Sequence, residues 1–261
     1  MSNNFITNTK ESVSLKERLQ KLIEVSYELK FLVGFFYFSS WQEIYQKLKE
    51  NNEVKLKILV GLQTDKYISK IIEIDHDESK LSNQQIFSRF LKSLGYAINN
   101  DEMDNEEFNR QVEFFIQMLE ENRLIIRKTR EPNHAKLYLF KLKENNFGLT
   151  NEFITGSSNL TKYGLSAQKE FNVEIRDYGF DKAEEYFDEL WEKAIPITEN
   201  IDNKKIILNF IKEQTHIAQI TPYEAYAYVL KTYIDLYETN RIKPDLDQFY
   251  QKTNSKNIAI N

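Results

Sequence analysis

The chain has 261 residues, 41% of them hydrophobic, and a formal net charge of −5 at pH 7. This length can bury a substantial core and suits one domain with an appendage, or two small domains. The absence of cysteine excludes disulfides, thiol catalysis and cysteine-based metal sites. The three histidines lack the spacing of a zinc site, so we expect no metal and no cofactor.

The first ten residues are polar, and the longest apolar run, residues 31–38, is far too short to cross a bilayer. We therefore expect neither a signal peptide nor a membrane segment. These features predict a cytoplasmic protein with no membrane partner.

The N-terminal part predicts a βαβ unit. A capping box over Ser14–Glu17 opens a helix, and residues 31–38 follow as a buried strand that is apolar on both faces. A second cap over Ser40–Glu43 opens another helix, and residues 54–61 form the next strand. The apolar positions of the first helix are Leu15, Leu19, Leu22 and Ile23. Strands joined in this way are expected to be parallel.

Residues 66–121 are charged and mostly helical in pattern, with a cap over Ser82–Gln85, and predict a helical insertion. His76 stands among acidic residues without the spacing of metal ligands, so we interpret it as part of a surface loop. Residues 124–127 then supply another strand and lead to a group of polar motifs.

These polar motifs lie near the ends of three further strands. His134 and Lys136 stand two residues apart at the start of an apolar and aromatic run, so we expect both side chains on one face of a strand. A second strand over 152–155 forms a hairpin with the first and runs into the sequence GSSN, residues 156–159. The third strand begins just after Glu170.

An imidazole, an ammonium, a carboxamide and a carboxylate together suit phosphodiester cleavage without a metal. Lys136 and Asn159 can hold the non-bridging phosphate oxygens and balance the charge that builds in the transition state. His134 can attack phosphorus, and Glu170 can accept the other ring N–H and fix the tautomer. The alternative is a buried strand pair with His134 and Lys136 at its rim, which explains each residue singly but not the ordered set.

In this order, the HxK pair, the GSSN sequence and the later glutamate resemble the signature of the phospholipase D superfamily, which includes phospholipases, cardiolipin synthases, tyrosyl-DNA phosphodiesterases and metal-independent nucleases. The resemblance implies an α/β fold, a layered mixed sheet flanked by helices, with His134 forming a phosphohistidine, Ser157 or Ser158 assisting and Glu170 buttressing the histidine. The residues that it assigns to catalysis are His134, Lys136, Ser157, Asn159 and Glu170. Lys141 replaces the aspartate of the family's full HxKxxxxD motif, which argues against a lipase more than against phosphodiester chemistry.

The negative net charge is unevenly spread. Residues 101–121 are strongly acidic, whereas residues 123–143, which surround His134, are strongly basic. Phosphate contacts need local charge rather than a basic protein, so this distribution is compatible with a nucleic-acid backbone as substrate. The predicted substrate-binding residues are Lys128, Arg130, Lys141 and Ser158. The alternative is that these charges are simply solvated around a strand.

An amphipathic helix over 180–194, ended by Pro196, closes the sheet-and-helix domain. We therefore predict a phosphodiesterase domain over 1–196 and a C-terminal helical extension or connector over 197–261. Residues 221–238 resemble the connector that joins a phospholipase D-like domain to a DEAD/DEAH-type helicase in bacterial proteins, and we interpret the tyrosines of this helix as packing residues. No P-loop occurs in the sequence.

Two functional classes stay open. The first is a metal-independent phosphodiesterase acting on DNA, as the N-terminal module of a helicase or of a restriction or defence system, with a helicase domain as partner. The second is a non-catalytic module that guides DNA; a phospholipid substrate is more remote. The superfamily's site uses two HxK motifs and this chain has one, so we hypothesise a homodimer in which the two copies of His134 face each other. The choice between DNA and RNA, the strandedness and the sequence specificity stay open.

Overall fold

The computed structural model describes residues 4–9, 13–34, 36, 38–61, 81–98, 106–143, 151–161, 163–167, 169–214, 226, 230, 231, 233 and 234. The chain divides into two compact units, Met1–Thr215 and His216–Asn261. His76 lies outside the described residues. In the second unit, Tyr226 and Tyr233 are helical and exposed, and the other tyrosines that were interpreted as packing residues lie outside the described residues. A helix buries only the side chains that another element covers.

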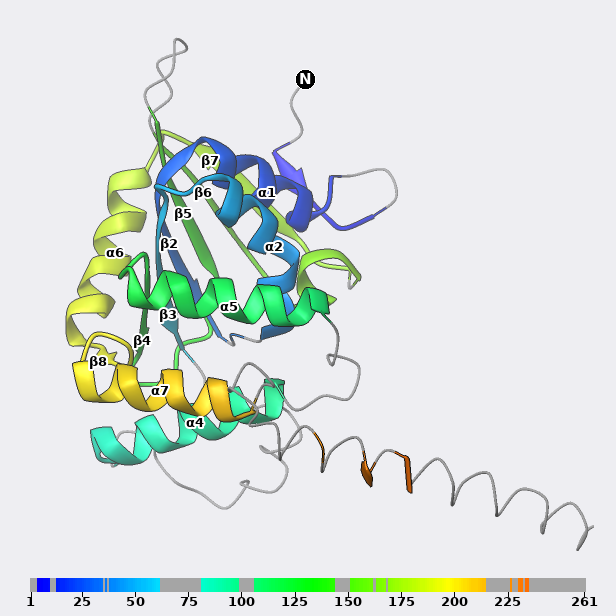
Figure 1. The fold of residues 1–261 in the computed structure, drawn as a ribbon. Coiled ribbons are helices and arrows are strands. Elements are labelled where there is room, and N and C mark those ends of the chain that lie inside the picture. The colour runs from blue at the N-terminus through cyan, green and yellow to red at the C-terminus, as the bar shows by residue number, and fades with distance from the viewer. Residues whose placement is uncertain are drawn as a thin grey trace, which may run out of the picture. The chain divides into compact units, whose positions relative to one another are not determined.

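The first unit is built on an eight-stranded mixed sheet (Figure 1). Its strands are β1 (Phe5–Ile6), β2 (Ser26–Val33), β3 (Lys55–Val60), β4 (Leu124–Lys128), β5 (Leu137–Leu142), β6 (Asn151–Gly156), β7 (Asn172–Arg176) and β8 (Ile195–Pro196). Their order across the sheet is β1-β7-β6-β5-β2-β3-β4-β8. β2, β3 and β4 are parallel, and the other neighbours are antiparallel. The predicted parallel βαβ unit and layered mixed sheet are confirmed.

Helices cover both faces of this sheet (Figure 1). α1 packs on β2 and β5, α5 on β4, and α6 on β5 and β6, whereas α4 and α7 pack on each other and on further helices. The helices described in this unit are α1 (Leu15–Val25), α2 (Phe38–Glu50), α4 (Asn83–Ile98), α5 (Glu106–Glu120), a short π-helix (Tyr163–Ala167), α6 (Phe180–Lys193) and α7 (Ile201–Gln214). On the face of α1, the rings of Tyr138 and Phe140 pack edge-on against Phe31. On the face of α6, Leu32 and Leu139 pack with Trp191. The capping box of α1 is present at Ser14, and the four predicted apolar positions of this helix are buried.

Two predicted boundaries near the N-terminus are wrong. The strand predicted over residues 31–38 is β2, which begins at Ser26 and ends at Val33. Its early start was hidden because Glu28 and Lys30 look like loop residues, yet both have ion-pair partners in the fold. α2 begins at Phe38, so Ser40 lies inside the helix, where it is buried, and does not cap it.

The helical segment between β3 and β4 contributes to the layers of the fold. β3 and β4 are parallel neighbours, and α4 and α5 lie between them in the chain. α5 packs against β4 and α2, so it serves as the crossover helix of a second parallel unit. The short strand β8 then pairs with β4 and closes that edge of the sheet, which the sequence pattern did not predict.

An ion-pair network ties α6 to the middle of the sheet. The ammonium of Lys30 donates to Glu184 at 2.5 Å and to Asp188 at 2.8 Å, and Lys141 contacts Glu184 at 2.7 Å. Burial works to raise the pKa of Glu184, but hydrogen bonds and charge from Lys141 and Lys30 hold that pKa below its ordinary value. Glu184 therefore stabilises the folded state in its ionised form.

We expect Glu184→Gln to lower the free energy of unfolding by about 1–3 kcal/mol at pH 7, because the buried ammonium of Lys30 and the half-buried ammonium of Lys141 lose a charged acceptor. The folded pKa of Glu184 lies below the unfolded value, so its contribution is present above the unfolded pKa and disappears as the pH falls through the folded one. The free energies of unfolding of the variant and the wild type should therefore become equal at low pH, and urea denaturation at several pH values measures this. The matched control is Glu185→Gln, whose partner Lys182 is a solvent-exposed surface group. Equal losses in both variants would contradict the assignment.

Candidate active site

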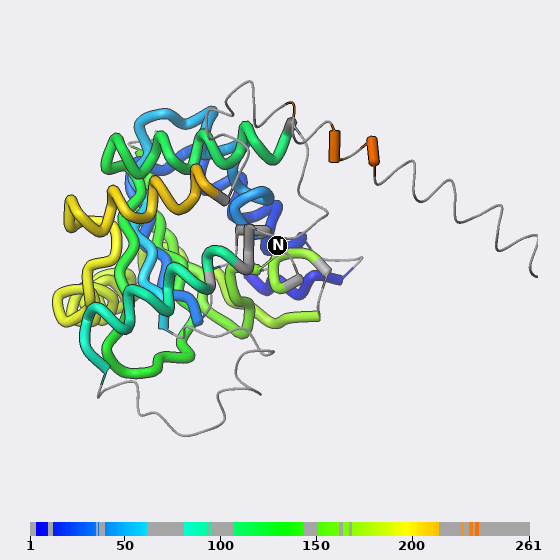
Figure 2. The backbone as a smooth tube through the Cα atoms, turned by 60° about the horizontal axis from the view of Figure 1, so that its bottom comes forward, coloured from blue at the N-terminus to red at the C-terminus, as the bar shows by residue number. Residues whose placement is uncertain are grey.

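The ends of six strands lie at one end of the sheet, at the bottom in Figure 1 and toward the viewer in Figure 2. The parallel strands β2, β3 and β4 end here, β6 also ends here, and β5 and β7 begin here. The register is set by Leu137, which pairs with Leu32 on one side and with Thr155 on the other, and by Gly156, which pairs with Asn172. Segments that adjoin these strand ends are therefore brought together although they are far apart in the sequence.

His134 and Lys136 lie on the loop that leads into β5, so the prediction that they share a strand face is wrong. Asn133 holds this loop. Its backbone N–H donates to the carbonyl of Gly61 at 3.1 Å, and its side-chain oxygen accepts from the N–H of Ala135 at 2.8 Å. This Asx-type turn keeps the chain out of the ladder and leaves His134 exposed.

Gly61, directly after β3, fits this loop closely. A Cβ at this position would lie 2.0 Å from the carbonyl oxygen of Asn133, a distance that no side chain tolerates. Thr129 adds a second tie, since its hydroxyl lies 3.2 Å from the carbonyl of Gly61 and 2.7 Å from that of Glu131. A glycine just after a buried strand was the available sequence signal, because it marks a close backbone approach.

Lys136 is half-buried, and its backbone joins the end of β6. The hydroxyl of Thr155 donates to the carbonyl of Lys136 at 2.9 Å. Asn159 follows β6, and its side-chain oxygen accepts from the N–H of Gly34 at 3.1 Å. This bond directs the other end of the carboxamide, the NH2 donor, away from β2.

Ser157 and Glu170 are direct partners. The hydroxyl of Ser157 donates to the Glu170 carboxylate and accepts from the N–H of Phe171 at 3.1 Å. Burial raises the pKa of Tyr138, and the charge of Glu170 raises it further. Among the described residues, no hydrogen bond joins Glu170 to His134, so the predicted buttressing contact is replaced here by a contact to Ser157.

Ser158 is fully buried behind the site. Its hydroxyl accepts from the side-chain amide of Asn172 at 2.9 Å, its N–H donates to the same side chain at 3.3 Å, and its carbonyl accepts from the Tyr138 hydroxyl at 2.8 Å. It therefore shapes the turn and does not offer its side chain to a substrate. Asn172 and Tyr138 were missed in the sequence because each stands inside an apolar strand pattern.

The three predicted substrate-binding cations lie in different places. Arg130 is exposed on the same loop as His134. Lys128 is 1% exposed, and its ammonium donates to the carbonyls of Gly61 and Thr129 at 3.1 and 3.0 Å. Lys141 lies near the far end of β5, in the network with Glu184. Of these three cations, only Arg130 is exposed near the strand ends where His134 lies.

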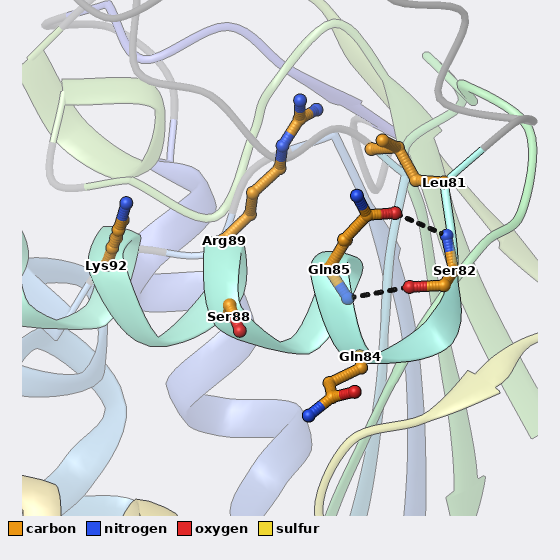
Figure 3. A pocket seen from close by; sticks show the side chains of 7 residues that line it. All are labelled: Leu81, Ser82, Gln84, Gln85, Ser88, Arg89 and Lys92. Carbon is orange, nitrogen blue, oxygen red and sulfur yellow. Dashed lines mark hydrogen bonds between the residues drawn. The ribbon is translucent and has the colours of Figure 1, made fainter.

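A hollow of about 400 Å³ lies beside the first turns of α4. Its lining residues are Leu81, Ser82, Gln84, Gln85, Ser88, Arg89 and Lys92. The side chains of Arg89 and Lys92 point to the same side of the helix, and Ser82 and Gln85 cap it reciprocally as predicted (Figure 3). Both wider views show α4 at the end of the sheet where β3 terminates (Figures 1 and 2).

Within the described part of the chain, no cluster of three or more histidine, aspartate or glutamate side chains is placed to hold a metal ion. None of the helices described is long and apolar enough to cross a membrane.

The described part of the chain is an α/β domain with a layered mixed sheet, and histidine, lysine, carboxamide and carboxylate side chains adjoin the ends of its strands. The chain belongs to the family described as "Cardiolipin synthase, PLD-like domain", which matches residues 27–191, and through it to the phospholipase D superfamily. No curated protein matches the chain by sequence.

The solved structures that match the chain include the following three. Nuc of Salmonella typhimurium, a phospholipase D family member, is 12% identical over 74% of this chain and 95% of its own, with a TM-score of 0.38. NucT of Helicobacter pylori is 13% identical over 74% and 96%, with a TM-score of 0.39. Phosphatidylserine synthase of Haemophilus influenzae is 13% identical over 80% and 44%, with a TM-score of 0.44.

Proposed function

We propose that this protein is a metal-independent phosphodiesterase that cleaves DNA through a phosphohistidine intermediate. The observation that supports the proposal is that the segments carrying His134, Lys136 and Asn159, and the Ser157–Glu170 pair, adjoin strand ends at the same end of the sheet. An exposed imidazole is accessible to phosphorus, and the two donors can hold the phosphate oxygens.

In the first step, a ring nitrogen of His134 forms a bond to phosphorus while the bond from phosphorus to the leaving oxygen breaks. The ammonium of Lys136 and the NH2 group of Asn159 balance the charge on the non-bridging oxygens. A general acid protonates the leaving oxygen. In the second step, water attacks phosphorus and gives a proton to the conjugate base of the general acid, the bond to the ring nitrogen breaks, and the imidazole is regenerated.

Local charge supports a polyanionic substrate even though the chain carries a net charge of −5. Arg130 is exposed on the loop of His134, and Arg89 and Lys92 line the hollow beside α4. Such cations can contact phosphates on either side of the one that is cleaved. The second candidate is a non-catalytic module that guides DNA, which would use the same residues for phosphate binding alone. A phospholipid substrate stays the remote alternative.

Incubating the protein with single-stranded and double-stranded DNA in EDTA tests the proposal. We expect cleavage that EDTA does not suppress and that is lost in His134→Ala. If the wild type and His134→Ala bound DNA equally strongly and neither cleaved it, the result would support the guiding module instead. Hydrolysis of a phospholipid in place of DNA would overturn the choice of substrate.

The general acid is proposed to be His134 of a second copy of the chain, because the sequence contains one HxK motif. We expect that adding inactive His134→Ala protein to wild-type protein lowers activity roughly as the square of the wild-type fraction, once subunits have exchanged. The measurement is the initial rate across a mixing series at constant total protein. A linear decline, together with a monomer in gel filtration, would remove the homodimer.

The wider setting is proposed to be a helicase or a restriction or defence system. Its support is the resemblance of residues 221–238 to a helicase connector. A helicase domain would then be the partner that delivers DNA to the phosphodiesterase. Copurification of this protein with an ATP-dependent DNA translocase in its native host would test this setting.

A further inference from the structure

Two phenylalanine rings stand exposed together on the β1–β7 edge of the sheet. Phe5 is 50% exposed and Phe171 is 57% exposed, and their ring centroids lie 5.4 Å apart at an angle of 32°. Phe5 pairs with Val173 in the register of β1 and β7, so Phe5 and Phe171 belong to the same face of the sheet. Their neighbour Ile6 points the other way and is buried.

This aromatic pair, Phe5 with Phe171, is fixed beside the candidate active site. Phe171 follows Glu170 directly and is tied to Ser157 by three hydrogen bonds, the longest of them, at 3.5 Å, from the Ser157 hydroxyl to the Phe171 carbonyl. In the two shorter bonds, the N–H of Ser157 donates to the carbonyl of Phe171 and the N–H of Phe171 donates to the Ser157 hydroxyl, both at 3.1 Å. The backbone that presents the ring is therefore the backbone that presents the predicted catalytic pair.

Two exposed aromatic rings that lie together beside a site offer an apolar surface to which a ligand can bind. The charges around it restrict what can bind. The Glu170 carboxylate repels a second phosphate close to the ring but tolerates a neutral base, whereas Lys169, exposed one residue earlier, can contact a phosphate farther along. A nucleotide offers this alternation of neutral ring and charged phosphate.

We propose that the aromatic pair is a stacking platform for an unpaired base next to the cleaved phosphate, so that the site prefers single-stranded nucleic acid. The inference rests on the proposed function, since it assumes that Lys136 and Asn159 hold a phosphodiester. Bases in a duplex are stacked on one another and cannot cover a ring of the protein without being unpaired. Every base has an aromatic face, so the platform accepts any sequence.

The test uses the 261-residue chain with His134→Ala, a change that prevents cleavage. It compares the binding of two labelled single strands, an oligothymidylate and an abasic strand of the same length. Fluorescence anisotropy in EDTA measures both. We expect the thymidylate to bind about 5-fold to 100-fold more tightly than the abasic strand. Phe171→Ala should remove this preference, Phe5→Ala should weaken it, and Phe171→Tyr should keep it.

The matched control is Tyr178→Ala, which removes an aromatic ring that is 87% exposed just beyond β7 and should leave the preference unchanged. Equal binding of the two strands by the parent protein, or a preference that survives Phe171→Ala, would overturn the platform while leaving the proposed function intact. Failure to bind either strand would instead contradict the proposed function. Loss of binding to phosphatidylglycerol vesicles in Phe171→Ala, with strand binding unchanged, would assign the rings to a lipid and overturn the inference.

Discussion

The variant His134→Ala is expected to lose more than about 1,000-fold in cleavage rate while keeping the fold. The loss follows because the imidazole supplies the nitrogen that bonds to phosphorus, and alanine offers no atom in its place. The fold should survive because the side chain is exposed and the turn that carries it is held by Asn133 and Gly61. Unchanged circular dichroism and an unchanged free energy of unfolding would confirm that only chemistry is affected.

Direct evidence for the role of His134 comes from stopping the wild-type reaction with base during turnover. A phosphorus–nitrogen bond should then be detected on this residue by mass spectrometry, and it should be absent from His134→Ala. Lys136→Ala is expected to lose about 100-fold or more, since it removes a charge that faces the transition state. Lys182→Ala, at an exposed lysine on α6, is the control and should retain full activity. Undiminished cleavage by His134→Ala would remove this histidine from the mechanism.

The variant Gly61→Ala is expected to lose both stability and activity, although Gly61 has no side chain and is not proposed to touch the substrate. The added methyl group would meet the carbonyl oxygen of Asn133, so the loop that carries His134 must move. Overpacking of this kind costs about 1–3 kcal/mol, and a displacement of about 1 Å at a reacting group can cost about 100-fold in rate. Urea denaturation and the cleavage rate per folded molecule measure the two effects separately.

Gly179→Ala serves as the matched glycine control. Gly179 has φ of +71°, and nothing lies within 4 Å of a Cβ placed there, so the change strains the backbone without a collision. Such strain costs about 1 kcal/mol. We expect this variant to be less stable but fully active per folded molecule. If Gly61→Ala also kept full activity per folded molecule, the close fit of Gly61 to the loop would have no part in positioning His134.

Local patterns were sufficient for most of the secondary structure. The capping box at Ser14 and the buried stripe of α1 were predicted correctly, because a cap needs only residues three apart and a helix face repeats within one turn. β5, β6 and β7 were recognised for a similar reason, since a buried strand shows its character within five or six residues. The order of His134, Asn159 and Glu170 along the chain was equally visible.

The sequence by itself determined which chemical groups are available and that they adjoin strand ends. Only the tertiary structure decided how they are used. Lys128 and Lys141 looked like substrate-binding cations, yet one holds buried carbonyls and the other pairs with Glu184 on a distant helix. The aromatic pair joins Phe5 and Phe171, which are far apart in the sequence. Strand order and register determine which residues become partners of this kind. Both depend on the packing of the whole sheet, so they cannot be predicted from a short stretch of sequence.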